Sequence, residues 1–329
     1  MTTAVVLLSY AAMAAMVGPW MLLTGGWSDR APRLAIVAWQ CLTVSVVAAV
    51  ALAGVALLIP TASVSGGLAE LLRACAMALS AQYSSPGGAA AAATGAILMT
   101  TVLGRLAWCL TVVLADARRR RSRHRTALDL VGTTVPGLGA VVLSADQPAV
   151  YCLPGRHRRI VVTSGALQLL TEEQLTLVLR HEQAHARQRH DLVLAWSQTA
   201  AKAFPRVPLF ATARAESARL VELLADDVAI GHDGNRLALA DALLTLSSAS
   251  APVAALAAGG STAGARVRRL INPHRPLGRV STALVASAAI GMLLLPVAVA
   301  VGPAASATQM DYCPTGTPVA AASMPSAAG

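Results

Sequence analysis

The sequence predicts a multi-pass α-helical membrane protein with an inserted α+β domain. Three observations lead to this fold class. Four long apolar segments are spread along the chain, short β-branched runs follow the third of them, and an HExxH motif at 181–185 precedes an ExxxD motif at 222–226. We therefore expect the inserted domain to contain a small antiparallel sheet, an HExxH helix and an ExxxD helix.

The composition places the chain among membrane proteins. Its 329 residues are 55% hydrophobic and only 13% charged, which is too apolar for an ordinary soluble domain. The net charge of +10 could indicate nucleic-acid binding. However, the basic residues are nearly all arginines beside apolar runs, without interleaved aromatic residues or a nucleic-acid motif. We expect the lipid bilayer as a partner and no direct contact with nucleic acid.

Four segments are long enough to span a bilayer, which needs about 20 helical residues. They are residues 4–23, 34–59, 91–114 and 280–301. The first segment has no basic region before it and no cleavage site after it. It is therefore interpreted as a transmembrane helix and not as a signal peptide.

The positions of the arginines predict the topology, because cytoplasmic loops carry an excess of basic residues. Arginines follow the first segment, form a run at 118–121 after the third, and precede the fourth at Arg266, Arg268, Arg269, Arg275 and Arg279. We expect a plasma-membrane protein with both termini outside the cell. The predicted parts are three transmembrane helices in 1–117, a cytoplasmic domain in 118–279, a fourth transmembrane helix in 280–302 and an extracytoplasmic low-complexity tail in 303–329.

Two features of the membrane part leave alternatives open. Leucines at helical spacing predict an outer amphipathic helix at 67–80, which carries Cys75. In this topology Cys75 and Cys313 are the two extracytoplasmic cysteines, and they either form a disulfide or stay as free thiols. Arg105 in the third segment either pairs locally within the helix bundle or acts in gating.

The cytoplasmic segment begins with strands and continues with helices. Residues 139–144, 149–153 and 159–164 are short β-branched runs separated by turn residues, so they predict a small antiparallel sheet. Thr171, with Gln174 three residues later, predicts a capping box that opens a helix through the HExxH motif.

On that helix, His181 and His185 lie one turn apart and project from the same face. Two neutral imidazoles in this arrangement can bind one Zn²⁺, and Glu182 can act as general base on the water beside the metal. A catalytic zinc site needs a third protein ligand. His190 is about half a turn out of phase with the metal face, so we expect it to mark the helix end.

A later apolar helix at 218–231 carries the better candidate for the third ligand. Glu222 and Asp226 lie one turn apart in this helix, and a buried helix seldom carries acids without a partner. Glu222 is therefore the predicted third ligand. Asp226 is then placed to accept the other ring N–H of a ligand histidine. The alternative is that both acids pair with Arg214 or Arg219.

The motif order HEQAH then ELLAD, preceded by the strands at 149–163, resembles the membrane-embedded gluzincin zinc metallopeptidases. That group includes HtpX-like and CAAX-prenyl-protease-like peptidases and, nearer in topology, the BlaR/MecR type. The similarity covers about residues 141–246. The resemblance implies that His181, His185 and Glu222 bind zinc, that Glu182 is the general base and that Asp226 supports a ligand.

The resemblance also implies how a protein or peptide substrate is held. The edge strand formed by Ala149, Val150, Tyr151 and Cys152 would bind an extended peptide by β-augmentation. His232, in the loop after the ExxxD helix, is a candidate for oxyanion or substrate contact, with an ordinary loop histidine as the alternative.

The expected function is a membrane-bound zinc endopeptidase that cleaves a cytoplasmic or membrane-proximal protein, for example a transcriptional repressor in signal transduction. BlaR/MecR sensors also carry a penicillin-binding domain with a Ser-x-x-Lys motif, which this sequence lacks, so β-lactam sensing is not carried over. The alternative is a catalytically silent membrane scaffold with a structural metal site. The intact Glu182 favours the enzyme, because a structural site needs no general base.

Overall fold

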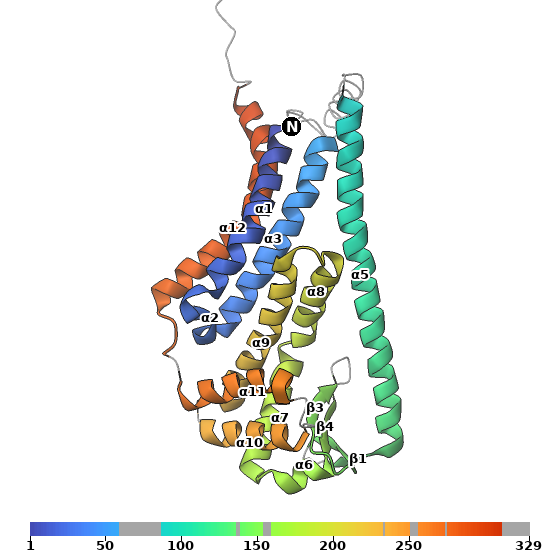
Figure 1. Ribbon diagram of the computed structural model, residues 1–329, viewed down its shortest axis with the longest axis vertical. Coiled ribbons are helices and arrows are strands. Elements are labelled where there is room, and N and C mark those ends of the chain that lie inside the picture. Colours follow the sequence, from blue (N-terminus) through green and yellow to red (C-terminus); the bar gives the residue numbers. More distant parts are fainter. Residues whose placement is uncertain are drawn as a thin grey trace, which may run out of the picture.

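The computed structural model describes residues 1–58, 87–135, 139–153, 159–232, 234–250, 256–273 and 275–310. Long helices form one end of the molecule, and a small sheet with shorter helices forms the other (Figure 1). The predicted outer helix at 67–80, together with Cys75 and Cys313, lies outside the described residues.

Four helices are long and apolar enough to cross a membrane, which suggests a membrane protein. They are α1 (Thr2–Leu23), α3 (Pro32–Leu58), α5 (Gly88–Val131) and α12 (Arg279–Met310). Helix α3 contacts the other three. Tyr10 on α1 and Ser45 on α3 both donate a hydrogen bond to the carbonyl of Met292 on α12. Polar side chains thus join three helices inside an apolar bundle.

Two of these helices are longer than the sequence analysis predicted. Helix α5 continues from the apolar segment through the arginine run to Val131, and α12 continues past residue 302 to Met310. Arginine is a good helix former, and no glycine or proline lies between Gly104 and Gly132. The arginine run therefore marks a change of polarity along α5 and not the end of the helix.

The sheet has four strands: β1 (Gly132–Val135), β2 (Ala140–Leu143), β3 (Val150–Leu153) and β4 (Arg159–Thr163). Their order is β1-β2-β4-β3, and β2 runs parallel to β4 while the other pairs are antiparallel. The prediction of a purely antiparallel sheet is therefore wrong, and β1 was missed. Strand β4, with Val161 and Val162 fully buried, takes an interior position and leaves β3 at the edge.

Among the described residues, six helices lie between the sheet and α12 along the chain. They are α6 (Ser164–Leu169), α7 (Glu172–Arg187), α8 (His190–Ala203), α9 (Pro208–Ile230), α10 (Arg236–Ser250) and α11 (Leu256–Ile271). Helix α7 begins at the predicted capping box, in which Thr171 accepts from the Gln174 amide and the Gln174 side chain accepts from the Thr171 amide. The predicted start of the HExxH helix is confirmed.

Helices α8 and α9 form a hairpin that packs against α3 and α5 (Figure 1). Gln40 on α3 donates to Ser217 on α9 at 3.2 Å, and Trp196 on α8 donates to Thr43 on α3 at 3.3 Å. Arg105 on α5 donates to the carbonyl of Ala203, the last residue of α8. Arg105 therefore has a partner on the inserted domain, 98 positions later in the chain. Helix α9, which carries the ExxxD motif, therefore rests directly on the membrane-length helices α1 and α3.

Candidate metal centre

Helix α7 brings the two histidines of the HExxH motif together. His181 and His185 project from the same side, and their Nε2 atoms lie 3.0 Å apart. The buried side of α7 consists of Leu177, Val178, His181 and Ala184, so the apolar pattern fixes which way the helix faces. His181 is buried because it belongs to that side.

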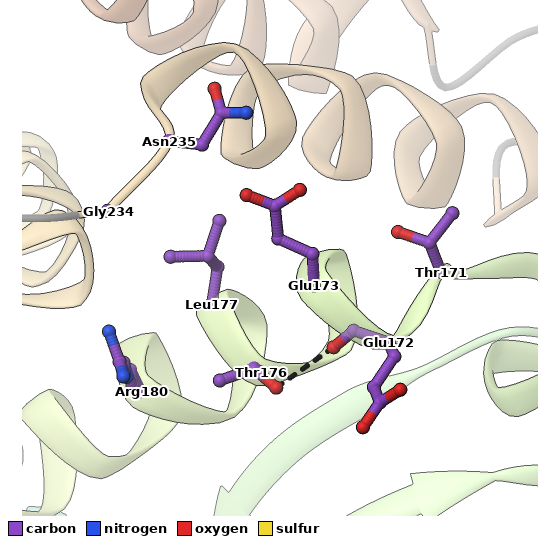
Figure 2. Close-up of a pocket in the computed structure, with 8 residues that line it drawn as sticks. All are labelled: Thr171, Glu172, Glu173, Thr176, Leu177, Arg180, Gly234 and Asn235. Atoms are coloured by element: carbon purple, nitrogen blue, oxygen red, sulfur yellow. Dashed lines mark hydrogen bonds between the residues drawn. The ribbon is translucent and has the colours of Figure 1, made fainter.

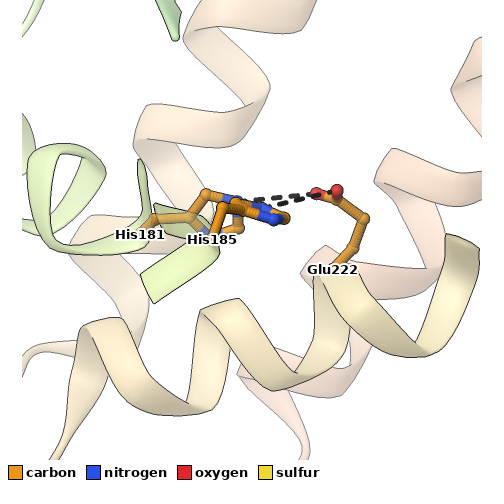
Figure 3. A group of neighbouring side chains, drawn as sticks. All are labelled: His181, His185 and Glu222. Carbon is orange, nitrogen blue, oxygen red and sulfur yellow. Dashed lines mark hydrogen bonds and ion pairs between the residues drawn. The ribbon is translucent and has the colours of Figure 1, made fainter. Parts of the chain in front are cut away.

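Helix α9 places Glu222 opposite the two histidines (Figure 3). The carboxylate oxygens lie 3.5 Å from Nε2 of His181 and 3.5 Å from Nε2 of His185. One ligand atom from each residue falls within 4.8 Å of the other two. A tetrahedral zinc with bonds of about 2.1 Å holds its donors about 3.4 Å apart, so this donor set fits zinc in both chemistry and spacing.

Asp226 lies behind His181, one turn after Glu222 on α9. Its Oδ1 atom is 3.0 Å from Nδ1 of His181, although the N–H direction is not well aligned with the oxygen. Asp226 is only 1% exposed. A buried carboxylate needs compensating charge, and an arginine supplies most of it.

That arginine is Arg266 on α11, which the sequence analysis did not identify. Its Nε and Nη2 atoms donate to the two carboxylate oxygens of Asp226 at 2.8 and 2.6 Å, and Nη1 lies 3.0 Å from Glu222. Arg219, one of the two arginines proposed as alternative partners, pairs instead with Glu216 and Asp29. One sequence feature could have indicated it: Arg266 stands next to the apolar Val267 and one helical turn before the apolar Leu270. Both of these apolar residues are buried in the structure.

The charges around the three donors also fit a divalent cation. When the carboxyl groups are ionised and the imidazoles are neutral, Glu182, Glu222 and Asp226 contribute three negative charges and Arg266 contributes one positive charge. The local net charge is then about −2 by this count, which a Zn²⁺ ion neutralises.

Glu182 points toward the sheet, and its Oε2 atom accepts a hydrogen bond of 2.9 Å from the backbone amide of Cys152. Thr163 donates to the carbonyl of Ala149, so Ala149 faces β4. Along an antiparallel strand these directions alternate, and the amides of Val150 and Cys152 therefore face away from β4. The structure thus brings the predicted general base to the outer side of the predicted substrate strand.

His190 is closer to the site than its spacing predicted. Helix α7 ends at Arg187, Arg189 adopts a left-handed conformation with φ 53°, and α8 begins at His190. This turn brings Nδ1 of His190 to 3.0 Å from Nδ1 of His185. No glycine marks the turn, so it is hard to predict from the sequence. His232 is exposed after the end of α9, ten residues beyond Glu222, and the structure does not bring it to the donors.

The environment shifts the pKa values of the two histidines in opposite directions. Burial lowers the pKa of His181, but contacts with Asp226 and Glu222 outweigh it and raise the pKa to about 9. Burial and the neighbouring positive charge of His181 lower the pKa of His185 to about 4. Burial also raises the pKa of Glu182, which makes its carboxylate a stronger proton acceptor.

Two pockets flank α7 and α9. The larger, of about 690 Å³, lies between the first turns of α7 and the start of α10 (Figure 2). Glu172, Glu173 and Arg180 line it, and none of the three candidate ligands does. A second pocket of about 460 Å³ is bordered by Glu222 and Arg266 and is therefore the one that adjoins the candidate site.

Comparison with known proteins gives a family match over less than half of the chain. Residues 114–262 match the family model described as Peptidase family M48. No curated protein and no solved structure matches the chain. The matched range includes both motifs, and M48 peptidases are generally zinc-dependent. The family match therefore supports a protease of the membrane-type M48 zinc metallopeptidases.

Proposed function

We propose that this protein is a membrane-bound zinc endopeptidase in which His181, His185 and Glu222 hold the metal. The convergence of these three donors, with Glu182 beside them, is the observation that carries the proposal. The substrate is a cytoplasmic or membrane-proximal protein. By its resemblance to the BlaR/MecR type, the peptidase acts in signal transduction, and a transcriptional repressor is a suitable substrate.

Each residue has a distinct part in the proposed reaction. Zinc held by the three ligands supplies Lewis acidity toward a peptide carbonyl and a nearby water. Glu182 takes a proton from the attacking water and delivers it to the leaving amine. Asp226 fixes the orientation of His181, and Arg266 compensates the buried charge of Asp226.

The substrate binds in extended form along β3. This strand lies at the edge of the sheet, and the amide and carbonyl of Val150 face away from β4. An added peptide strand would pair with these groups and pass beside Glu182, which contacts the next outward-facing residue, Cys152.

In the proposed topology the domain at 118–279 is cytoplasmic, the protein lies in the plasma membrane and both termini are outside. The arginines that flank the apolar segments support this orientation. The α8–α9 hairpin contacts α3 and α5, which keeps the active site close to the membrane and favours membrane-proximal substrates.

The proposal is tested by comparing the native protein with Glu182→Gln in detergent. Both should bind one zinc, and only the native protein should cleave an unstructured substrate such as casein. A chelator should stop the cleavage, and added zinc should restore it. Comparison of the proteomes of cells that express each form would identify the natural substrate. Zinc binding without cleavage by the native protein would favour the silent membrane scaffold.

A further inference from the structure

The connection between α1 and α3 reaches from the membrane-length helices to the helices of the candidate metal centre. It consists of a short turn (Thr24–Gly26) and α2 (Trp27–Arg30). Gly25 and Gly26 have φ values of 82° and 60°, in the left-handed region that favours glycine. These two residues turn the chain so that α2 lies against α9.

Asp29 on α2 contacts two arginines on two different helices. Its carboxylate accepts a hydrogen bond from Nη1 of Arg219 on α9. Its backbone carbonyl accepts from Nε of Arg269 on α11 at 3.0 Å. The neighbouring Ser28 accepts from Nη2 of Arg219 at 3.2 Å. One residue of the connection therefore joins α9 to α11.

Both arginines lie one helical turn from residues of the candidate site. Arg219 precedes Glu222 by three positions on α9, and Arg269 follows Arg266 by three positions on α11. A shift of either arginine along its helix therefore moves Glu222 or Arg266 with it. Since Arg266 lies 3.0 Å from Glu222, the spacing of the two helices sets the position of a proposed ligand.

Among the described side chains, apolar packing joins α9 and α11 at one end only, where Ile230 lies in the same buried cluster as Val267 and Leu270. The pocket of about 460 Å³ lies between the two helices and α2, and Asp29, Arg219 and Arg269 line it together with Glu222. Where a protein interior has no such pocket, interdigitated side chains hold neighbouring helices together. Around this pocket the helices are joined by charged side chains, so ion pairs hold their separation at this end.

We propose that Asp29 is a positioning residue that couples the α1–α3 connection to the metal ligand Glu222. The inference rests on the proposed function, because it takes Glu222 to be a ligand. Asp29 acts through Arg219 and Arg269. Together with the direct pairs that Arg266 and Arg269 make with α9, it holds α9 and α11 at the separation that lets Glu222 face the two histidines. A movement of α1 against α3 would reach the metal centre by this route.

The charges allow this role to be tested without unfolding the protein. Arg219 keeps a second partner in Glu216, at 2.8 Å, and Arg269 keeps a bidentate pair with Asp227, at 2.7 and 2.8 Å. Asp29→Ala removes the side-chain contact with Arg219 and keeps the backbone contact with Arg269. Both arginines still have a carboxylate partner, and we expect the variant to fold. Asp29→Asn, which keeps the size and an acceptor oxygen, serves as a milder second variant.

The test measures the zinc dissociation constant of the full-length protein in detergent. We expect Asp29→Ala to weaken zinc binding about tenfold, at the lower end of the effect of residues that support metal ligands. Arg219→Ala should weaken it similarly, and the double variant should be little worse than either single one, because both act through one contact. Asp129→Ala is the matched control. It removes another Asp–Arg pair, which joins α5 to β4 through Arg159 and lies away from α9.

Hydrogen–deuterium exchange of the metal-free protein provides a readout that does not depend on zinc. Asp29→Ala should speed exchange in the α9 segment 216–224, and Asp129→Ala should not. Unchanged exchange in that segment would overturn the inference, and so would faster exchange with native zinc affinity. If the native protein binds no zinc, the proposed function fails. The exchange measurement then decides alone whether Asp29 holds α9.

Discussion

The backbone amide of Cys152 donates a hydrogen bond of 2.9 Å to the carboxylate of Glu182. This contact joins the edge strand to the proposed general base. It holds the carboxylate in one orientation, and it lowers the pKa of Glu182 against the larger opposing effect of burial. The same strand can then bind an extended peptide and orient the group that acts on it.

Replacing Cys152 by proline tests this contact. Proline has no N–H, and the amide of Cys152 faces away from β4, so the substitution removes the hydrogen bond without breaking the β3–β4 ladder. We expect kcat to fall at least about tenfold, the equivalent of one hydrogen bond to a charged group. The pKa of Glu182 should rise, so the acidic limb of the pH–rate profile should move to higher pH.

Val150→Pro is the matched control for that variant. Its amide also faces outward but does not contact Glu182, so we expect a higher KM for casein with kcat little changed. A Cys152→Pro variant with native kcat and native pH profile would show that the contact does not orient the base.

The ligand set is tested by metal content. His181→Ala and Glu222→Ala should lose zinc, because each removes one of three converging donors. Glu182→Gln should retain it, since its carboxylate points to β3. Elemental analysis of the purified variants would measure the zinc content. Full zinc in Glu222→Ala would show that another residue is the third ligand.

Zinc binding should release a proton near pH 7. The pKa of His181 is about 9, so the metal-free protein carries a proton there, whereas His185, with a pKa of about 4, carries none. Zinc requires the neutral ring, and its affinity should therefore rise as the pH increases toward about 9 and level off above it.

Calorimetric titration with zinc in two buffers of different ionisation enthalpy measures the protons released. Asp226→Asn should reduce the release, because the Asp226 charge helps to raise the pKa of His181. This account of the site would be contradicted if zinc binding released no proton at pH 7. It would also be contradicted if Asp226→Asn released as many protons as the native protein.

Arg266→Lys tests the charge compensation of Asp226. Lysine keeps the positive charge but cannot form the bidentate pair that Arg266 makes at 2.8 and 2.6 Å. We expect zinc affinity to fall by about tenfold, as for other residues that support metal ligands. Competition with a zinc-binding dye would measure this change. Native zinc affinity in Arg266→Lys would mean that a positive charge at this position is enough to compensate the charge of Asp226.

The topology is tested with a reporter that is active only in the cytoplasm. Fused after Leu246, it should be active, and fused at Gly329, it should be silent, because the positions of the arginines predict that residues 118–279 lie inside. Reporter activity at Gly329 would show that the fourth segment does not span the membrane or that the orientation is the opposite one.

The sequence by itself determined the features that depend on neighbouring residues. The capping box of Thr171 and Gln174 set the start of α7, and helical spacing put His181 and His185 on one face. The same spacing put Asp226 one turn after Glu222. Such features follow from the helical repeat and from caps, which act over three or four residues.

Only the tertiary structure decided which distant residues meet. Strand β4 lies between β2 and β3, and its pairing with β2 is parallel. Arg266 reached Asp226 across 40 positions, and Arg219 reached Asp29 across 190. The left-handed backbone conformation of Arg189 brings His190 into contact with His185. No local rule selects these partners, because each pairing depends on how whole helices and strands pack and on which buried charges then need compensation.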